Sequence, residues 1–318
     1  MKMFKKNKQS FDKIEESKNI KSLFNEDFIN KFLQNNFLSS NTIIHNFAGK
    51  HMVLPNDKLN TSCPDCVGCG CPMTYDESDN FPDKEIKYEY NSDCYRCDEF
   101  NLEDSNYNFL FNGCSVTIGT GLPYEGTWAY QLNKDLGGKK FYNLATNGGS
   151  YKSIINDTYT YIRKYGKPKG VFIMFPNIQR LVSFMEYKDT VKQTTIHFAF
   201  MDDIKEVMTE EFTYYDFYSS VCALEDYLNS LNIPFLWSTW NQEVDQNLCK
   251  IQKNFKNYTS MFYHEKTKMF FANKDYPIEI SKKYWEKSRD MLHSGVKMQM
   301  WHKKILEYEW KKRYENIN

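Results

Sequence analysis

From residue 109 onward, short apolar runs alternate with longer amphipathic stretches. The apolar runs predict strands at 108–114, 139–146, 170–176 and 233–239. The amphipathic stretches predict helices at 125–137, 150–166, 203–231 and 295–314. Strands that alternate with helices of this length are typical of a parallel sheet with helices on both faces. We therefore predict an α/β fold.

The composition of the chain changes near residues 60 and 106, which predicts three parts. Residues 1–59 are polar, with apolar side chains at helical spacing around 25–35. Residues 60–105 are rich in Cys, Asp, Pro and Gly and almost free of periodic hydrophobicity. This composition is typical of a small unit held by something other than an apolar core. Residues 106–318 form the predicted α/β domain.

Composition limits the classes of partner. The 318 residues include 41 Lys or Arg and 41 Asp or Glu, so the net charge is zero and gives no long-range attraction to nucleic acid or anionic membranes. No apolar run approaches the roughly 18 residues of a membrane span. The basic N-terminus lacks the apolar segment of a secretory signal. We expect a cytoplasmic protein, unless it is carried elsewhere in an assembly such as a virion.

Small and polar residues follow three of the predicted strands, and an Asp–His pair precedes the last helix. These segments are Gly113-Cys114-Ser115, Asn147-Gly148-Gly149, Pro176-Asn177 and Asp290-Met291-Leu292-His293. In a parallel sheet, ligands bind outside the carboxyl ends of the strands. We therefore expect the four segments to meet at one edge of the sheet and to form a site.

Together these segments hold the groups that acyl transfer needs. The Ser115 hydroxyl is a weak nucleophile that needs a base, and His293 can take its proton and return it to the leaving group. Asp290 can accept a hydrogen bond from the other ring nitrogen and so fix the imidazole tautomer. The backbone N–H groups of Ser115 and Gly148 and the side chain of Asn177 are candidate oxyanion donors, each worth roughly 3–4 kcal/mol.

The order and spacing of these segments resemble the SGNH (GDSL-like) hydrolase superfamily over residues 107–314. The stretches that resemble its first, second and last blocks are NGCSVTIGTGLPYEGTWAYQL, FYNLATNGGSYKSI and SRDMLHSGVKMQMWHKKI. The resemblance implies a flavodoxin-like three-layer sandwich with about five parallel strands. It also implies a triad of Ser115, Asp290 and His293, with Gly148 and Asn177 in the oxyanion hole.

The third block departs from the family pattern. That pattern is Gly-x-Asn-Asp, and the chain has Phe-Pro-Asn-Ile at 175–178. If Asn177 is not the donor, Arg180 or another group takes its place. The register between Gly148 and Gly149 also stays open. The glycine-rich segment IGTGLPYEG matches neither the dinucleotide nor the P-loop spacing, so a phosphate-binding loop is not favoured.

Two C-x-x-C pairs in the Cys-rich part predict a structural zinc site. The four candidate ligands are Cys63, Cys66, Cys94 and Cys97. Cys69 and Cys71 lie between the pairs, so the choice of ligands stays open, and free thiols or an iron–sulfur cluster are the alternatives. Cys114, beside Ser115, is expected to point into the core, as small buried cysteines do.

The leading interpretation is an enzyme, an SGNH-type esterase that cleaves an acyl or acetyl ester of a carbohydrate or lipid. In this interpretation the Cys-rich module, with its zinc, binds a protein partner or the substrate. The alternative is a catalytically silent SGNH fold that serves binding or assembly, which the altered third block favours. We expect the loops at 178–202 and 257–287 to determine specificity.

Overall fold

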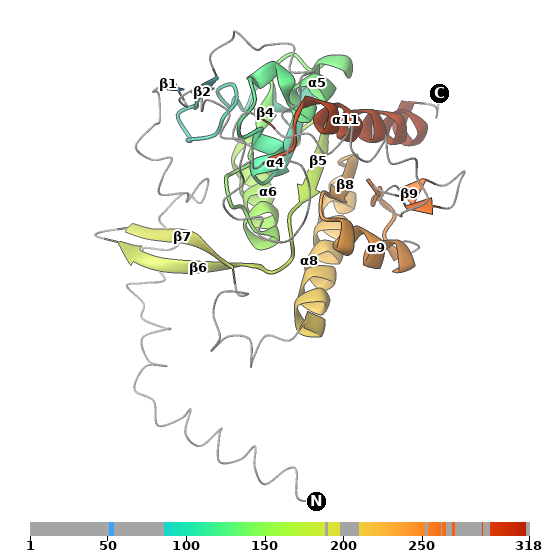
Figure 1. Ribbon diagram of the computed structural model, residues 1–318. Coiled ribbons are helices and arrows are strands. Elements are labelled where there is room, and N and C mark those ends of the chain that lie inside the picture. The colour runs from blue at the N-terminus through green and yellow to red at the C-terminus, as the bar shows by residue number, and fades with distance from the viewer. Residues whose placement is uncertain are drawn as a thin grey trace, which may run out of the picture.

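The computed structural model describes residues 51–53, 86–187, 190–197, 210–251, 254–261, 263–264, 269–270, 288 and 293–315. Its centre is a sheet of four parallel strands in the spatial order β4-β3-β5-β8 (Figure 1). The strands are β3 (Phe109–Gly113), β4 (Tyr142–Asn143), β5 (Gly170–Phe175) and β8 (Phe235–Thr239). All their residues are buried, as in sheets covered on both faces. The α/β prediction is confirmed.

One face of the sheet is covered by α5 (Trp128–Asp135) and α11 (Val296–Trp310). Side chains alternate between the two faces along a strand, so ring contacts identify the covering helix. Phe109 of β3 packs edge-on against Trp310, with ring centroids 5.4 Å apart, and Phe111 packs against Trp128 at 5.7 Å. The last helix of the fold therefore closes over the first strand of the sheet.

The opposite face is covered by α6 (Tyr151–Tyr165) and α8 (Glu210–Ser230). Asn112, which alternates with Phe111 on β3, donates a 2.9 Å hydrogen bond to the Ile154 carbonyl in α6. Phe175 of β5 packs against Phe217 of α8 at 5.4 Å. The described residues therefore form a three-layer arrangement of helices, sheet and helices (Figure 1).

Shorter elements complete the unit. They are α4 (Ser115–Ile118), α9 (Gln242–Ile251), the 3₁₀ turns η1 (Ser105–Tyr107) and η2 (Tyr124–Gly126), and the π-helical turn η5 (Lys311–Glu315). The described bounds of the predicted helices lie within the predicted ranges, whereas α9 was missing from the sequence prediction.

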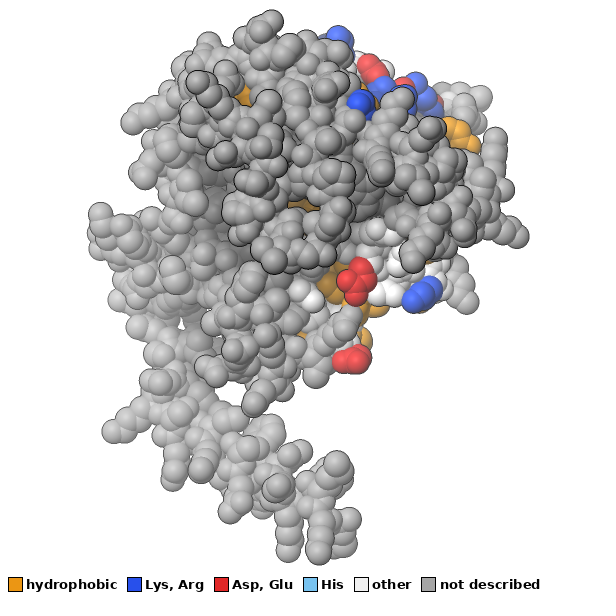
Figure 2. Space-filling view, in the orientation of Figure 1, with side chains coloured by type: hydrophobic (Ala, Val, Ile, Leu, Met, Phe, Trp, Pro, Cys, Tyr) orange, Lys and Arg blue, Asp and Glu red, His pale blue; other side chains and the backbone are white. Residues whose placement is uncertain are grey.

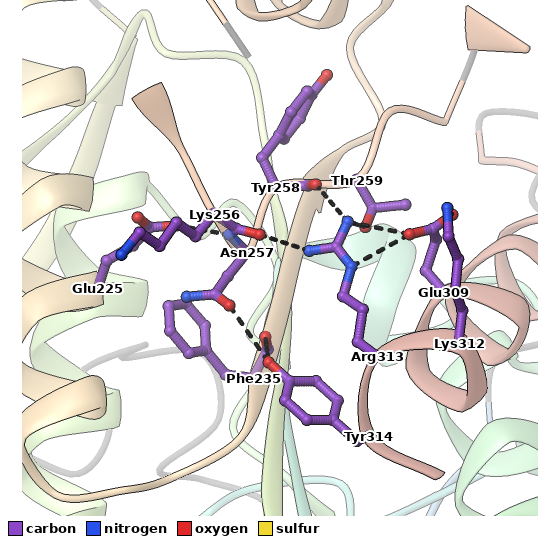
Figure 3. Close-up of polar contacts among 10 residues, drawn as sticks. All are labelled: Glu225, Phe235, Lys256, Asn257, Tyr258, Thr259, Glu309, Lys312, Arg313 and Tyr314. Atoms are coloured by element: carbon purple, nitrogen blue, oxygen red, sulfur yellow. Dashed lines mark hydrogen bonds and ion pairs between the residues drawn. The ribbon is translucent and has the colours of Figure 1, made fainter. Parts of the chain in front are cut away.

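A single parallel bridge extends the sheet beyond β8. Trp237 donates its N–H to the Asn257 carbonyl at 3.0 Å, and Thr259 donates to the Trp237 carbonyl at 2.9 Å. Figure 3 shows how η5 holds this segment: Arg313 donates to the carbonyls of Lys256 and Tyr258, at 2.6 and 3.1 Å. Four parallel strands and one bridge are thus described, where the resemblance implied about five parallel strands.

Three antiparallel pairs lie outside the central sheet. They are β1 (His51–Val53) with β2 (Lys87–Glu89), β6 (Arg180–Tyr187) with β7 (Thr190–His197), and β9 (Tyr263–His264) with β10 (Met269–Phe270). The β6–β7 hairpin leaves the carboxyl end of β5 and projects from the body of the protein (Figure 1). The prediction that 178–202 is a loop is wrong for these sixteen strand residues.

The end of the predicted Cys-rich part packs on the α/β unit. Tyr95 and Cys97 belong to the same apolar core as β3 and β5. Arg96 is 1% exposed and donates hydrogen bonds to three carbonyls at the end of α4 and in the loop after it, those of Ile118, Gly119 and Leu122, at 2.8–3.0 Å. These three carbonyl groups belong to the glycine-rich segment, which is therefore hydrogen-bonded to Arg96 within the fold.

Acidic and basic side chains intermingle on the surface of α11. Lys303 pairs with Asp135 and, at 2.6 Å, with Glu307, which also pairs with Lys311 at 2.6 Å. Figure 2 shows this mixture of signs at the upper right, over α11. Among the described residues, no helix combines the length and apolarity that a membrane crossing requires.

Candidate functional site

Ser115 is the first residue of α4 and follows directly on the central strand β3. Cys114 precedes the helix in an extended conformation, and its carbonyl accepts the N–H groups of Thr117 and Ile118, at 2.9 and 3.0 Å. The hydroxyl and the N–H of Ser115 make no hydrogen bond with any other described residue. Ser115 is 6% exposed. Among the described residues, the hydroxyl and the helix-start N–H of this candidate nucleophile therefore have no partner.

The turn after β4 distinguishes the two candidate glycines. Gly149 donates its N–H to the Thr146 carbonyl at 3.1 Å, whereas the N–H of Gly148 has no acceptor among the described residues. Gly148 has φ +71°, a conformation that favours glycine. A Cβ on Gly149 would lie 3.1 Å from the Gly113 carbonyl oxygen, beside β3. Gly148 is therefore the glycine with an available donor.

Asn177 follows β5, on the other side of β3 from Gly148. Its Oδ1 accepts the backbone N–H of Gln179 at 2.8 Å, which fixes the carboxamide in an Asx turn. The side chain is half-buried, and its Nδ2 makes no hydrogen bond with another described residue. The turn therefore leaves the side-chain NH₂ group without a partner among the described residues, so it is available as a donor.

The segment of His293 is linked to α4 through the next residue in the chain. Its carbonyl accepts the N–H of Ser288 at 3.0 Å. The hydroxyl of the adjacent Ser294 accepts a 3.2 Å hydrogen bond from Gln299, which also donates to the Val116 carbonyl at 3.0 Å. The structure thus ties the His293 segment to the residue after Ser115. Asp290, the third predicted triad member, lies outside the described residues.

Trp240, which follows β8, links the loops at the carboxyl edge of the sheet. Its indole N–H donates to the sulfur of Cys114 at 3.1 Å, and Cys114 is fully buried, as predicted. The Arg180 guanidinium lies 5.9 Å from the Trp240 ring and donates to the Gly149 carbonyl at 3.4 Å. Segments after β3, β4, β5 and β8 therefore touch one another, as expected for a site at this edge.

Of the four predicted zinc ligands, Cys94 and Cys97 are described. The Cys97 sulfur accepts a hydrogen bond from Asn91 Nδ2, at 3.4 Å. Such donors orient and stabilise metal-bound thiolates. Burial raises the pKa of both thiols, with the charge of Asp93 adding to the effect on Cys94.

The rest of the predicted zinc site lies outside the described residues, namely Cys63, Cys66 and the alternatives Cys69 and Cys71. Within the described part of the chain, no three His, Cys, Asp or Glu side chains group to hold a metal ion. The five described cysteines form no disulfide. The zinc site stays a prediction.

Two residues of the site were missed by the sequence interpretation. Gln299 is a polar position in an amphipathic helix, and Trp240 is an aromatic residue after a strand. Neither carries a motif, and their roles depend on partners 183 and 126 positions away.

No protein-family model matches the chain, and no curated protein is significantly similar to it.

Proposed function

We propose that this protein is a serine hydrolase of the SGNH type, with a flavodoxin-like sheet, that cleaves an ester. One observation carries the proposal. The strand that leads to Ser115 lies between the strands that lead to Gly148 and Asn177. In the flavodoxin strand order, ligands usually bind at the switch point between two particular strands. The corresponding strands here are β3 and β5. A hydroxyl with available N–H donors on both sides is what acyl transfer requires.

The proposed reaction has two halves. Ser115 Oγ attacks the ester carbonyl while His293 takes its proton, and the C–O bond to the alcohol then breaks as His293 protonates the leaving oxygen. Water next attacks the acyl-serine, again with His293 as base, and releases the acid and free Ser115. The N–H groups of Ser115 and Gly148 and the Nδ2 of Asn177 would bind the oxyanion in both halves. Asp290 would accept the second ring N–H of His293.

The proposed substrate is an acyl or acetyl ester of a carbohydrate or a lipid. The β6–β7 hairpin begins at Arg180, which contacts the loop of Gly149. A projecting hairpin that starts at the site is in reach of a substrate larger than the scissile group. This location supports a role of the 178–202 segment in specificity.

We also propose that the Cys-rich part binds one structural zinc and serves as a docking module for a protein partner or the substrate. Cys63, Cys66, Cys94 and Cys97 would hold the ion. The hydrogen bond from Asn91 to the Cys97 sulfur supports this. Metal analysis of the full chain should find about one zinc per chain, and less than half of that in Cys97→Ser. Equal zinc in both proteins would contradict the ligand set.

Hydrolysis of 4-nitrophenyl acetate tests the proposed activity. The full chain should release 4-nitrophenol with saturation kinetics, and Ser115→Ala should lose at least about 10³-fold in kcat. Ser219→Ala, at an exposed serine of α8, is the matched control and should keep full activity. Absent turnover by a folded, zinc-loaded chain, or equal turnover by Ser115→Ala, would favour the catalytically silent binding fold instead.

A further inference from the structure

Arg180 has more hydrogen-bonding capacity than the fold uses. A guanidinium carries five N–H donors. The side chain makes one hydrogen bond to a described residue, the 3.4 Å contact with the Gly149 carbonyl, which is long for such a bond. No carboxylate within the described ranges pairs with it. Its charge is therefore unbalanced by any described neighbour.

The other arginines that the fold fixes differ from Arg180. Arg96 makes three hydrogen bonds to carbonyls and stacks on Tyr88 at 4.1 Å. Arg313 pairs with Glu309 at 3.0 Å and donates to two carbonyls. Both guanidinium groups thus make at least three hydrogen bonds within the chain, as expected of structural arginines. The Arg180 side chain is fixed by its contacts, but most of its N–H donors have no partner among the described residues.

The contacts of Arg180 place it beside the proposed oxyanion donors. It lies three residues after Asn177, whose carbonyl accepts its backbone N–H at 3.4 Å. Its side chain reaches the carbonyl of Gly149, next to Gly148. The Trp240 ring, 5.9 Å from the guanidinium carbon, limits the directions in which that group can point. The side chain is half-buried, so it is accessible to a ligand while partly desolvated.

We propose that Arg180 forms an anion subsite, and that the substrate is an ester of an acidic molecule. This inference rests on the proposed function and specifies its substrate class. A planar guanidinium beside an aromatic ring is suited to bind a carboxylate or a phosphate through two parallel hydrogen bonds. The anionic group of the substrate would bind Arg180 while its ester carbonyl lies between Ser115, Gly148 and Asn177.

Binding of three matched sugars to the full chain, measured by calorimetry at low salt, tests the proposal. Galactose, galacturonic acid and galactose 6-phosphate share a ring and differ in the group at carbon 6. The wild-type protein should bind one of the two acids at least about 10-fold more tightly than galactose. The preferred acid then distinguishes a carboxylate subsite from a phosphate subsite.

Three variants test whether Arg180 is responsible for the preference for the acid. Arg180→Gln should abolish the preference for the acid, and Arg180→Lys should keep part of it, because an ammonium retains the charge but not the fork. Arg163→Gln removes the same charge from the exposed last turn of α6 and should leave the preference intact. An absent preference in the wild type, or one that survives in Arg180→Gln, would overturn the subsite. Because these sugars carry no ester, the result is independent of turnover at Ser115.

Discussion

Gln299 donates a hydrogen bond from its Nε2 to the carbonyl oxygen of Val116, 3.0 Å away and 183 positions earlier in the chain. The same buried amide accepts the N–H of Trp128 at 3.0 Å and donates to the hydroxyl of Ser294 at 3.2 Å. One side chain thus joins α4, α5 and the segment that carries His293. It links the segment of the candidate base to the helix of the candidate nucleophile.

Gln299→Leu should therefore lower both stability and activity. The substitution leaves the Val116 carbonyl and the Trp128 N–H buried without partners, so the free energy of unfolding should fall by about 2–4 kcal/mol. Ester hydrolysis should fall further than the folded fraction, because the His293 segment loses its attachment. Urea denaturation and initial rates measure the two effects. Lys304→Leu, exposed on the same helix, is the control, and an equal loss in both variants would contradict this role.

Asn177→Asp tests the side-chain donor without changing its shape. A carboxylate can still accept the Gln179 N–H, so the Asx turn and the fold should survive. The variant lacks the Nδ2 donor, and kcat should fall about 10²–10³-fold. Asn229→Asp adds the same charge at an exposed position near the end of α8 and should keep wild-type rates. If Asn177→Asp also keeps them, another group supplies the oxyanion donor.

The strands and the position of Ser115 could be predicted because they depend on local patterns. Buried parallel strands appear as continuous apolar runs, and β3, β5 and β8 lie inside them. The β6–β7 hairpin was missed because its strands mix polar and apolar residues and the residues between them are Lys-Asp, not a favoured hairpin turn pair. The role of Gln299 could not be predicted, because it arises from side-chain contacts across the fold.

The burial of His302 predicts that the folded chain loses stability in acid. The ring is 1% exposed, neither nitrogen has a partner among the described residues, and burial lowers its pKa to about 3 from the usual 6.5. The unfolded chain binds a proton at this histidine below about pH 6.5 while the folded chain does not, so stability should fall as pH decreases. The contribution is roughly 1 kcal/mol per pH unit. His302→Leu should flatten the stability curve between pH 6.5 and 4, and parallel curves would contradict the assignment.

Asp157 predicts the opposite trend with pH. It is 3% exposed on α6, its Oδ1 has no hydrogen-bond partner among the described residues, and burial raises its pKa well above the usual value. The folded chain retains this proton where the unfolded chain loses it, so stability should fall as pH rises above about 4. Asp157→Asn should gain about 1–3 kcal/mol at pH 7 and almost nothing at pH 3.5. A stability loss at pH 7 in urea denaturation would show that the ionised carboxylate is paired.

Labelling with a fluorophosphonate tests the central claim most directly, because the probe reacts only with a serine whose base and oxyanion donors are assembled. Mass spectrometry then identifies the modified residue. We predict one adduct per chain on Ser115, lost in Ser115→Ala and strongly slowed in His293→Ala, with Ser219→Ala labelled like the wild type. A folded wild-type chain that forms no adduct, or forms it on another serine, would contradict the proposed hydrolase site.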